Sequence, residues 1–141
     1  MRAMTPDERR AFLLEGSRTA KLATVRRDGR PHVVPVWFDL DGDDVMLTTG
    51  AKTVKGRAIR RDGRVCLCVD DETPPFAFVT IEGEAIVEQS PGELLRWATR
   101  IGGRYMGSER AEEYGRRNAV EGELLVRVRP ARVVARAGIA A

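Results

Sequence analysis

Histidine and cysteine are scarce in this chain, which has one histidine, His32, and two cysteines, Cys66 and Cys68. A structural zinc site of the usual Cys/His type needs four such ligands, so we expect no metal. A catalytic triad would have to be built around His32 alone, and neither a Gly-x-Ser-x-Gly elbow nor a Walker sequence is present. We expect His32 to be a half-exposed structural residue and the cysteines to be free core thiols.

Long apolar runs are also absent, since no segment approaches the ~20 residues that a membrane-spanning helix needs. The first residues, MRAMTPDERR, lack the apolar core of a signal peptide. The formal net charge is only +3, and many arginines are interspersed with acids, as in GSERAEEYGRR. A nucleic-acid binder would concentrate its basic charge. We therefore expect a cytoplasmic protein with neither a membrane nor a nucleic acid as partner.

Turn residues divide the 141 residues into short strands and helices of one expected domain, 1–141. Its N-terminal helix, capped by Thr5, covers 6–16, and a barrel with helical inserts covers 19–136. We predict strands at 19–25, 32–40, 45–49, 64–69, 76–88, 122–130 and 131–137, the last two hinged at Pro130. Three further helices are expected. One follows Thr53, one begins at a capping box at Ser90 and ends at Gly102-Gly103, and one begins at Ser108. The fold class is mainly β with short helices, a six- to seven-stranded antiparallel barrel.

The stretch TTGAKTVKGRAIRRDGRV (48–65) contains two of the chain's three lysines. Thr48 and Thr49 end a strand, Gly50 allows a close approach of the backbone, and Thr53 caps a helix. Lys55 and Arg57 then follow in the first turn. Cations there oppose the helix dipole, whereas a phosphate at a helix N-terminus is favoured. The stretch therefore indicates a phosphate site, although the two side chains could instead extend into solvent.

Taken together, "DGRPHVVPV", "TVKGRAIRRDGRV" and "IEGEA", in this order, resemble the flavin-binding split-barrel superfamily, which includes pyridoxamine 5′-phosphate oxidase. The likeness covers roughly residues 8–136 and is strongest to the branch of probable F420-dependent enzymes, F420 being a deazaflavin coenzyme. It implies an FMN-binding type of split β-barrel and a homodimer with two cofactor sites at its interface.

The resemblance also implies roles for individual residues. The strand 45–49 lies beside the tricyclic ring, Val34, Pro35 and Val36 line the ring from an adjacent strand, and Thr53, Lys55 and Arg57 hold the phosphate. Phe78, in the segment 76–78, lies near the interface and is expected to serve the other subunit's site.

Two departures from the family pattern limit what can be carried over. The family commonly has Arg-Asn-Leu where this chain has Arg57, Ala58 and Ile59, so one amide contact is missing. True pyridoxamine 5′-phosphate oxidases have an Arg-x-His pair near the C-terminus, which the ending VVARAGIAA lacks. We therefore do not expect that activity.

The likeness implies an oxidoreductase that transfers a hydride between F420 and a small, hydrophobic or quinone-like acceptor. In such an enzyme the cofactor supplies the chemistry, and the protein binds it and shapes the pocket. If a side chain supplies a proton, the candidate is Tyr105, for which a helix-packing role is the favoured alternative. FMN in place of F420, and a non-catalytic protein that binds a flavin, a deazaflavin or haem, stay open as alternatives.

Overall fold

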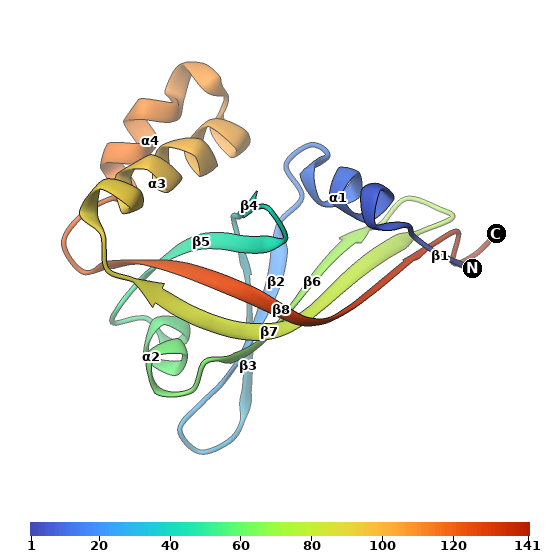
Figure 1. Cartoon of the computed structure of the whole chain (residues 1–141), viewed down its shortest axis with the longest axis horizontal. Coiled ribbons are helices and arrows are strands. Elements are labelled where there is room, and N and C mark those ends of the chain that lie inside the picture. Colours follow the sequence, from blue (N-terminus) through green and yellow to red (C-terminus); the bar gives the residue numbers. More distant parts are fainter.

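The computed structural model describes residues 1–141, which form eight strands and four α-helices (Figure 1). The strands are β1 (Arg2–Ala3), β2 (Ala20–Val25), β3 (Pro31–Val36), β4 (Asp39–Asp41), β5 (Asp44–Gly50), β6 (Arg64–Asp71), β7 (Ala77–Glu88) and β8 (Glu123–Ala137). The helices are α1 (Pro6–Leu14), α2 (Val54–Arg61), α3 (Pro91–Met106) and α4 (Ala111–Asn118), with a short 3₁₀ turn at Ser108–Arg110.

All strands belong to one antiparallel sheet in the order β3-β2-β6-β7-β8-β5-β4, with β1 paired to the far end of β8. The sheet curls around a common core, so that the mainly β split barrel expected from the sequence is confirmed. The two ends of this order, β3 and β4, do not pair with each other. Beyond Met46 the edge of β5 that faces away from β8 therefore has no strand neighbour.

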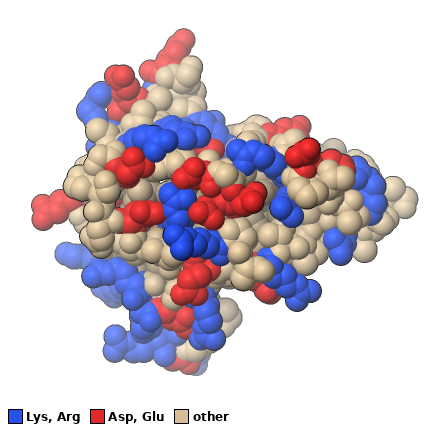
Figure 2. Space-filling view, in the orientation of Figure 1, with Lys and Arg blue, Asp and Glu red and all other residues tan.

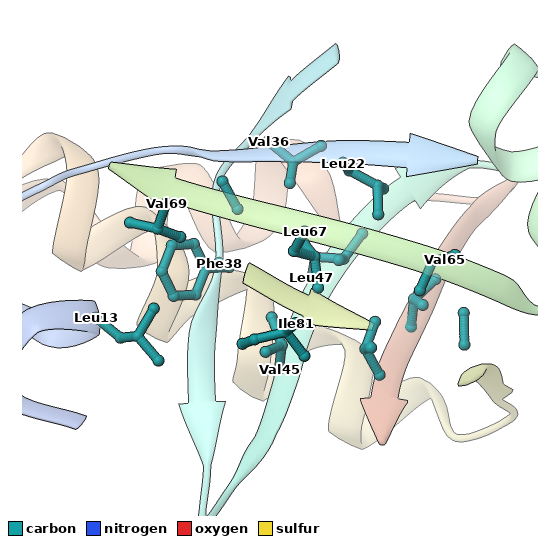
Figure 3. Close-up of a cluster of buried hydrophobic side chains, with 14 of the residues drawn as sticks. Leu13, Leu22, Val36, Phe38, Val45, Leu47, Val65, Leu67, Val69 and Ile81 are labelled. Atoms are coloured by element: carbon teal, nitrogen blue, oxygen red, sulfur yellow. The ribbon is translucent and has the colours of Figure 1, made fainter. Parts of the chain in front are cut away.

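The core lies inside the curled sheet and is made of alternate residues from nearly every strand (Figure 3). Val65, Leu67 and Val69 of β6 point inward, which follows from the two-residue period of a strand. Helix α1 adds Leu13 at one end of the core. Complete burial of each such side chain contributes about 1.5–3 kcal/mol.

Cys66 and Cys68 share one face of β6, as their spacing predicts, but that face is not the core. Both thiols are free and half-buried on the outer side of the sheet. Burial raises the pKa of each thiol. The expectation of core thiols was therefore wrong, because Val65, Leu67 and Val69 take the inward positions of this strand.

Three predicted boundaries differ from the structure. The strand expected at 32–40 is divided into β3 and β4, with Trp37 and Phe38 between them. Strand β8 continues through Pro130 without a hinge, because the register shifts at Gly83 and leaves a bulge beside the proline. A bulge tolerates proline since the extra residue needs no ladder hydrogen bond.

The third difference is the end of α3, which continues through Gly102-Gly103 to Met106. A Cβ atom on Gly102 would lie 2.6 Å from the Cβ atom of Tyr114, and one on Gly103 would lie 3.1 Å from that of Ala111. The two glycines therefore allow α4 to pack closely against α3. The predicted capping box at Ser90 was wrong too, since its side chain makes no capping hydrogen bond.

Candidate functional site

Helix α2 begins where β5 ends, and Thr53 joins the two elements. Its hydroxyl accepts a hydrogen bond from the Gly56 amide at 3.0 Å and donates one to the Gly50 carbonyl at 2.8 Å. The hydroxyl of Thr49 lies 3.1 Å away from that of Thr53. The predicted N-cap at Thr53 is confirmed, and these bonds fix the start of the helix against the end of the strand.

Glycine at position 56 is required by this close packing. A Cβ atom there would lie 2.1 Å from the Gly50 carbonyl oxygen, a distance that no side chain tolerates. The first turn of α2 therefore contacts the backbone of β5 directly.

Two amides at the start of α2 have no hydrogen-bond partner within the chain. The first backbone bond of the helix runs from the Arg57 amide to the Thr53 carbonyl at 3.0 Å, which leaves the amides of Val54 and Lys55 unpaired. Unpaired amides at a helix N-terminus bind anions. Lys55 supplies a positive charge at the same place and is half-buried.

Lys55 also lacks an ion-pair partner. The ion pairs of the chain involve Lys21 and nine arginines, and Lys55 is not among them. A half-buried ammonium group without a carboxylate partner is open to an anionic ligand.

A pocket of about 260 Å³ lies beside Lys55 at the split of the barrel, between the end of β3 and the free edge of β5. Its wall comes from three strands and three helices. The lining residues are Pro35, Val36, Trp37, Thr48, Thr49, Gly50, Lys55, Ala98, Ile101, Asn118 and Glu123.

The free edge of β5 gives this pocket its backbone hydrogen-bonding groups. Residues 47–50 pair with β8 on one side only. In an antiparallel strand the peptide groups point alternately to the two sides, so alternate groups of this segment are available to a ligand. A flat heterocycle with polar edges matches such a strand edge.

Trp37, Ala98 and Ile101 form an apolar part of the wall. The ring of Trp37 stacks on that of Tyr105, with centroids 5.0 Å apart and planes 3° from parallel. The Tyr105 hydroxyl donates to the Arg18 carbonyl at 2.8 Å and accepts from the Phe38 amide at 3.2 Å. Burial raises its pKa.

These contacts give Tyr105 the helix-packing role that the sequence left open. Tyr105 does not line the pocket. Its hydroxyl is already bonded on both sides within the chain, to Arg18 and to Phe38.

Glu123, the first residue of β8, is directly opposite Gly50 in the sheet register. Burial raises the pKa of its carboxyl group, and the charge of Lys55 partly opposes that rise. The carboxylate and the ammonium group thus belong to one pocket without forming an ion pair.

The pocket brings together six of the ten residues that the sequence predicted for cofactor binding: Pro35, Val36, Thr48, Thr49, Gly50 and Lys55. Thr53 lies next to it as the helix cap, and Arg57 is exposed on α2. Val34 packs against the core, because the inward positions of β3 alternate. Phe78 is half-buried on β7, outside the pocket.

Sequence reasoning missed Trp37, Ala98, Ile101, Asn118 and Glu123 as pocket residues. Four of these come from α3, α4 and β8, far along the chain from Lys55. Strand β3 is also not adjacent to β5, since the two face each other across the split rather than in the hydrogen-bonded sheet. Only the three-dimensional closure of the barrel places them together.

His32 is half-buried and its Nδ1 atom has no hydrogen-bond partner in the chain. No group of three or more His, Cys, Asp or Glu side chains has an arrangement suited to a metal ion. None of the helices has the length and apolar character needed to cross a membrane.

Comparisons with known proteins place the whole barrel in one family. The profile of the pyridoxamine 5′-phosphate oxidase family matches residues 5–136. A search of curated protein sequences returned no match.

Among solved structures, a conserved hypothetical protein from Mycobacterium tuberculosis is 28% identical and superposes with a TM-score of 0.84, over 96% of this chain and 86% of the other. An F420 reductase is also 28% identical, with a TM-score of 0.67 over 87% of this chain and 94% of that one. The haem storage protein HutZ of Vibrio cholerae shares the fold at 20% identity, with a TM-score of 0.76 and full coverage of both chains. This chain belongs to the pyridoxamine 5′-phosphate oxidase family and has its flavin-binding type of split barrel.

Proposed function

We propose that this protein is an F420-dependent oxidoreductase that uses the pocket at the split of the barrel to bind the deazaflavin. When bound, the coenzyme supplies hydride transfer to or from a small, hydrophobic or quinone-like acceptor. The observation that supports this most directly is Lys55, half-buried without an ion-pair partner beside two unpaired amides of α2 and next to an apolar wall.

The chain's own residues would bind and orient the coenzyme. Lys55 and the amides of Val54 and Lys55 would hold the phosphate, and the free edge of β5 would receive the polar edge of the ring. Trp37 and Ile101 would exclude water from the reacting face. No side chain of the pocket is required as a nucleophile for a hydride transfer.

Two observations favour F420 over FMN. The first is the 28% identity to an F420 reductase over 87% of this chain. The second is a group of basic side chains on α2, the helix of Lys55, and on the β2–β3 hairpin; Figure 2 shows basic side chains at the lower left, where Figure 1 has α2. Its basic residues without an ion pair are Arg26, Arg27, Lys52, Arg57, Arg60 and Arg61. The anionic oligoglutamate tail of F420 would meet opposite charge there.

Varying the length of the oligoglutamate tail tests the charge argument for F420. We expect affinity for F420 to rise with the number of glutamates, and to fall with rising salt as expected for screened surface charge. In the double variant Arg27→Gln/Arg60→Gln the dependence on tail length should be lost while binding of the phosphate remains. Equal affinity for all tail lengths in the wild-type protein would remove this argument.

We also propose that the protein acts as a homodimer with its sites at the interface. The outer face of the sheet carries apolar side chains that a second copy would cover, with Val33 63% exposed. Ala23 and Cys66 continue this face across β2 and β6, and the polar residues Glu82 and Thr80 continue it on β7. Phe78 lies on the same face and would serve the partner's site. Sedimentation equilibrium tests this, since a monomer at micromolar concentration would contradict the proposal.

The first experiment is a parallel titration of the purified protein with F420 and with FMN. Trp37 lines the pocket whereas Trp97 is fully buried among Met46 and Leu125. Quenching of the tryptophan fluorescence should therefore come mainly from Trp37 and should be reduced in Trp37→Phe. Micromolar or tighter binding of F420, with little binding of FMN, is the expected result.

The alternative outcomes separate the remaining candidates. Preference for FMN would make the protein a flavin enzyme of the same fold. Tight binding of any of these groups or of haem, without turnover on a panel of quinones and enones, would favour a binding protein. Failure to bind F420 would contradict the proposed function.

A further inference from the structure

The pocket contains polar side chains that make no hydrogen bond to any other part of the chain. Thr48, Asn118 and Glu123 line it, and each has a free hydroxyl, amide or carboxylate. These groups are half-buried in the wall of the pocket, and a bound ligand that covers them must supply hydrogen-bond partners for them. Three free groups in one pocket therefore suit a ligand that is itself rich in hydrogen-bonding groups.

Glu123 is the most informative of the three. It lies opposite Gly50 in the register, and the carbonyl of Gly50 accepts a hydrogen bond from Thr53, the cap of α2. Its carboxylate can only accept hydrogen bonds when ionised. Burial raises its pKa, which reflects the cost of an ionised group with few donors around it.

Lys55 relieves that cost only in part, because it forms no ion pair with Glu123. Lys55 of α2 acts on Glu123 only at a distance. On the other side, Glu121 and Glu88 line a neighbouring pocket that shares Glu123, and both are acidic. Arg127 is bound to Glu88 at 2.5 Å, to Asp41 at 2.9 Å and to Asp44 at 2.9 Å, so its donors are already used.

The chemistry of the ligand decides what Glu123 can contact. A phosphate carries negative charge and would be repelled by a carboxylate. The hydroxyl groups of a polyol linker are neutral donors, and such a linker joins the phosphate to the ring in both F420 and FMN. Lys55, Glu123 and the apolar wall line one pocket, so a linker that joins a phosphate at Lys55 to a ring on that wall would share the pocket with Glu123.

We propose that Glu123 is a specificity-determining residue that accepts hydrogen bonds from the hydroxyl groups of the cofactor's linker, aided by Asn118. This inference rests on the proposed function of the pocket. It predicts that the site selects polyhydroxylated linkers and discriminates against ring compounds whose linker is a plain alkyl chain. The amide of Asn118 can donate to the same hydroxyls or accept from them.

A series of truncated ligands tests the inference. Lumiflavin has the ring without linker or phosphate, riboflavin adds the polyol, and FMN adds the phosphate; the corresponding deazaflavins form a second series. We expect Glu123→Ala to weaken binding of riboflavin or its deazaflavin counterpart by about tenfold or more, because a hydrogen bond to a charged group is lost. Binding of the linker-free ring should not change.

Matched controls distinguish a loss of linker binding from a loss of phosphate binding. Lys55→Ala should weaken FMN and F420 but leave riboflavin unchanged. Glu121→Ala removes a nearby exposed carboxylate that does not line this pocket, and should alter none of the affinities. Glu123→Gln keeps the shape and one acceptor oxygen, and should fall between the wild type and Glu123→Ala.

Several results would overturn the inference. Unchanged or tighter riboflavin binding in Glu123→Ala would show that the carboxylate does not bind the linker. Equal weakening of lumiflavin and riboflavin would mean that Glu123 supports the pocket wall instead. If no ring compound binds the wild-type protein, the proposed function itself fails, which is a different outcome from ring binding that is insensitive to Glu123.

Discussion

Arginine has opposite surroundings at the two helical regions of this molecule. On α3, on α4 and in the 3₁₀ turn between them most arginines are paired, as in Arg96–Glu93 at 2.9 Å, Arg100–Asp39 at 3.4 Å and Arg110–Glu113 at 2.7 Å. Arg104 of α3 donates instead to backbone carbonyls, of Leu13 and Phe38 at 2.7 Å.

Helix α2 has no acid in its first turn, and none of its cations forms an ion pair within the chain. An arginine that is paired with a carboxylate has its charge balanced within the chain and needs no external anion. A group of cations left unpaired beside a pocket instead attracts an anionic ligand. The distribution of partners is therefore more informative than the net charge of +3.

Among the substitutions that test this comparison, replacement of Gly56 should have the largest effect, on both stability and phosphate binding. Gly56→Ala places a Cβ atom against the Gly50 carbonyl, and we expect a loss of about 1–3 kcal/mol in the free energy of unfolding. Because α2 must then move from β5, phosphate binding should weaken as well. Chemical denaturation and cofactor titration measure the two effects.

Gly92 of α3 is the matched control for Gly56. Nothing lies within 4 Å of a Cβ atom at that position. Gly92→Ala should be neutral or should stabilise the protein by up to about 1 kcal/mol. Equal destabilisation by both substitutions would contradict the close contact of α2 with β5.

The second-largest effect is expected on cofactor binding when Lys55 is replaced. Lys55→Ala should weaken binding of a phosphate-bearing cofactor at least tenfold, since a charge-assisted contact contributes about 1.5–3 kcal/mol. Lys52→Ala, which removes an exposed lysine of the same surface, should have a smaller effect. An unchanged dissociation constant for Lys55→Ala would remove the phosphate assignment.

A pH-dependent effect is expected at the far end of α2. Hydrogen bonds from Arg64 to Asp62 lower the pKa of its carboxyl to about 2. A pKa lowered by folding stabilises the protein above the ordinary Asp value, and that contribution is lost as pH falls toward 2. Asp62→Asn should therefore lower the melting temperature slightly at pH 7, with the difference vanishing near pH 2.

The smallest effect is expected just before α4. Arg110→Gln, in the 3₁₀ turn Ser108–Arg110, removes one exposed pair with Glu113, and an ion pair exposed to solvent contributes little to stability. Cofactor affinity should not change. A large loss of affinity would show that the paired arginines also serve the ligand and would erase the contrast between the two regions.

Sequence reasoning succeeded where the determinants are local. A threonine cap, a following lysine and a strand end all lie within eight residues, so the start of α2 and its cationic character could be predicted. The sequence also showed that the side chains of β6 alternate between two faces. It did not show which of the two faces packs into the core. That depends on which side the sheet curls toward.

Long-range packing explains the errors. Gly102 and Gly103 look like a helix end, yet they are the contact surface for Tyr114 and Ala111. Pro130 looks like a hinge, yet the shift opposite Gly83 accommodates it within one strand. Glu123 and Asn118 carry no motif at all: the pairing of β8 with β5 brings Glu123 opposite Gly50, and the packing of α4 brings Asn118 to the same pocket.

The pairing of β1 with the end of β8, Arg2 with Ala137, brings the two chain ends together. Figure 1 shows both ends at the opposite side of the molecule from α2. A tag, a surface tether or a fused redox partner could therefore be attached at either terminus and leave the pocket accessible. For the same reason, a short peptide could join the two ends and new termini could be opened elsewhere in the chain.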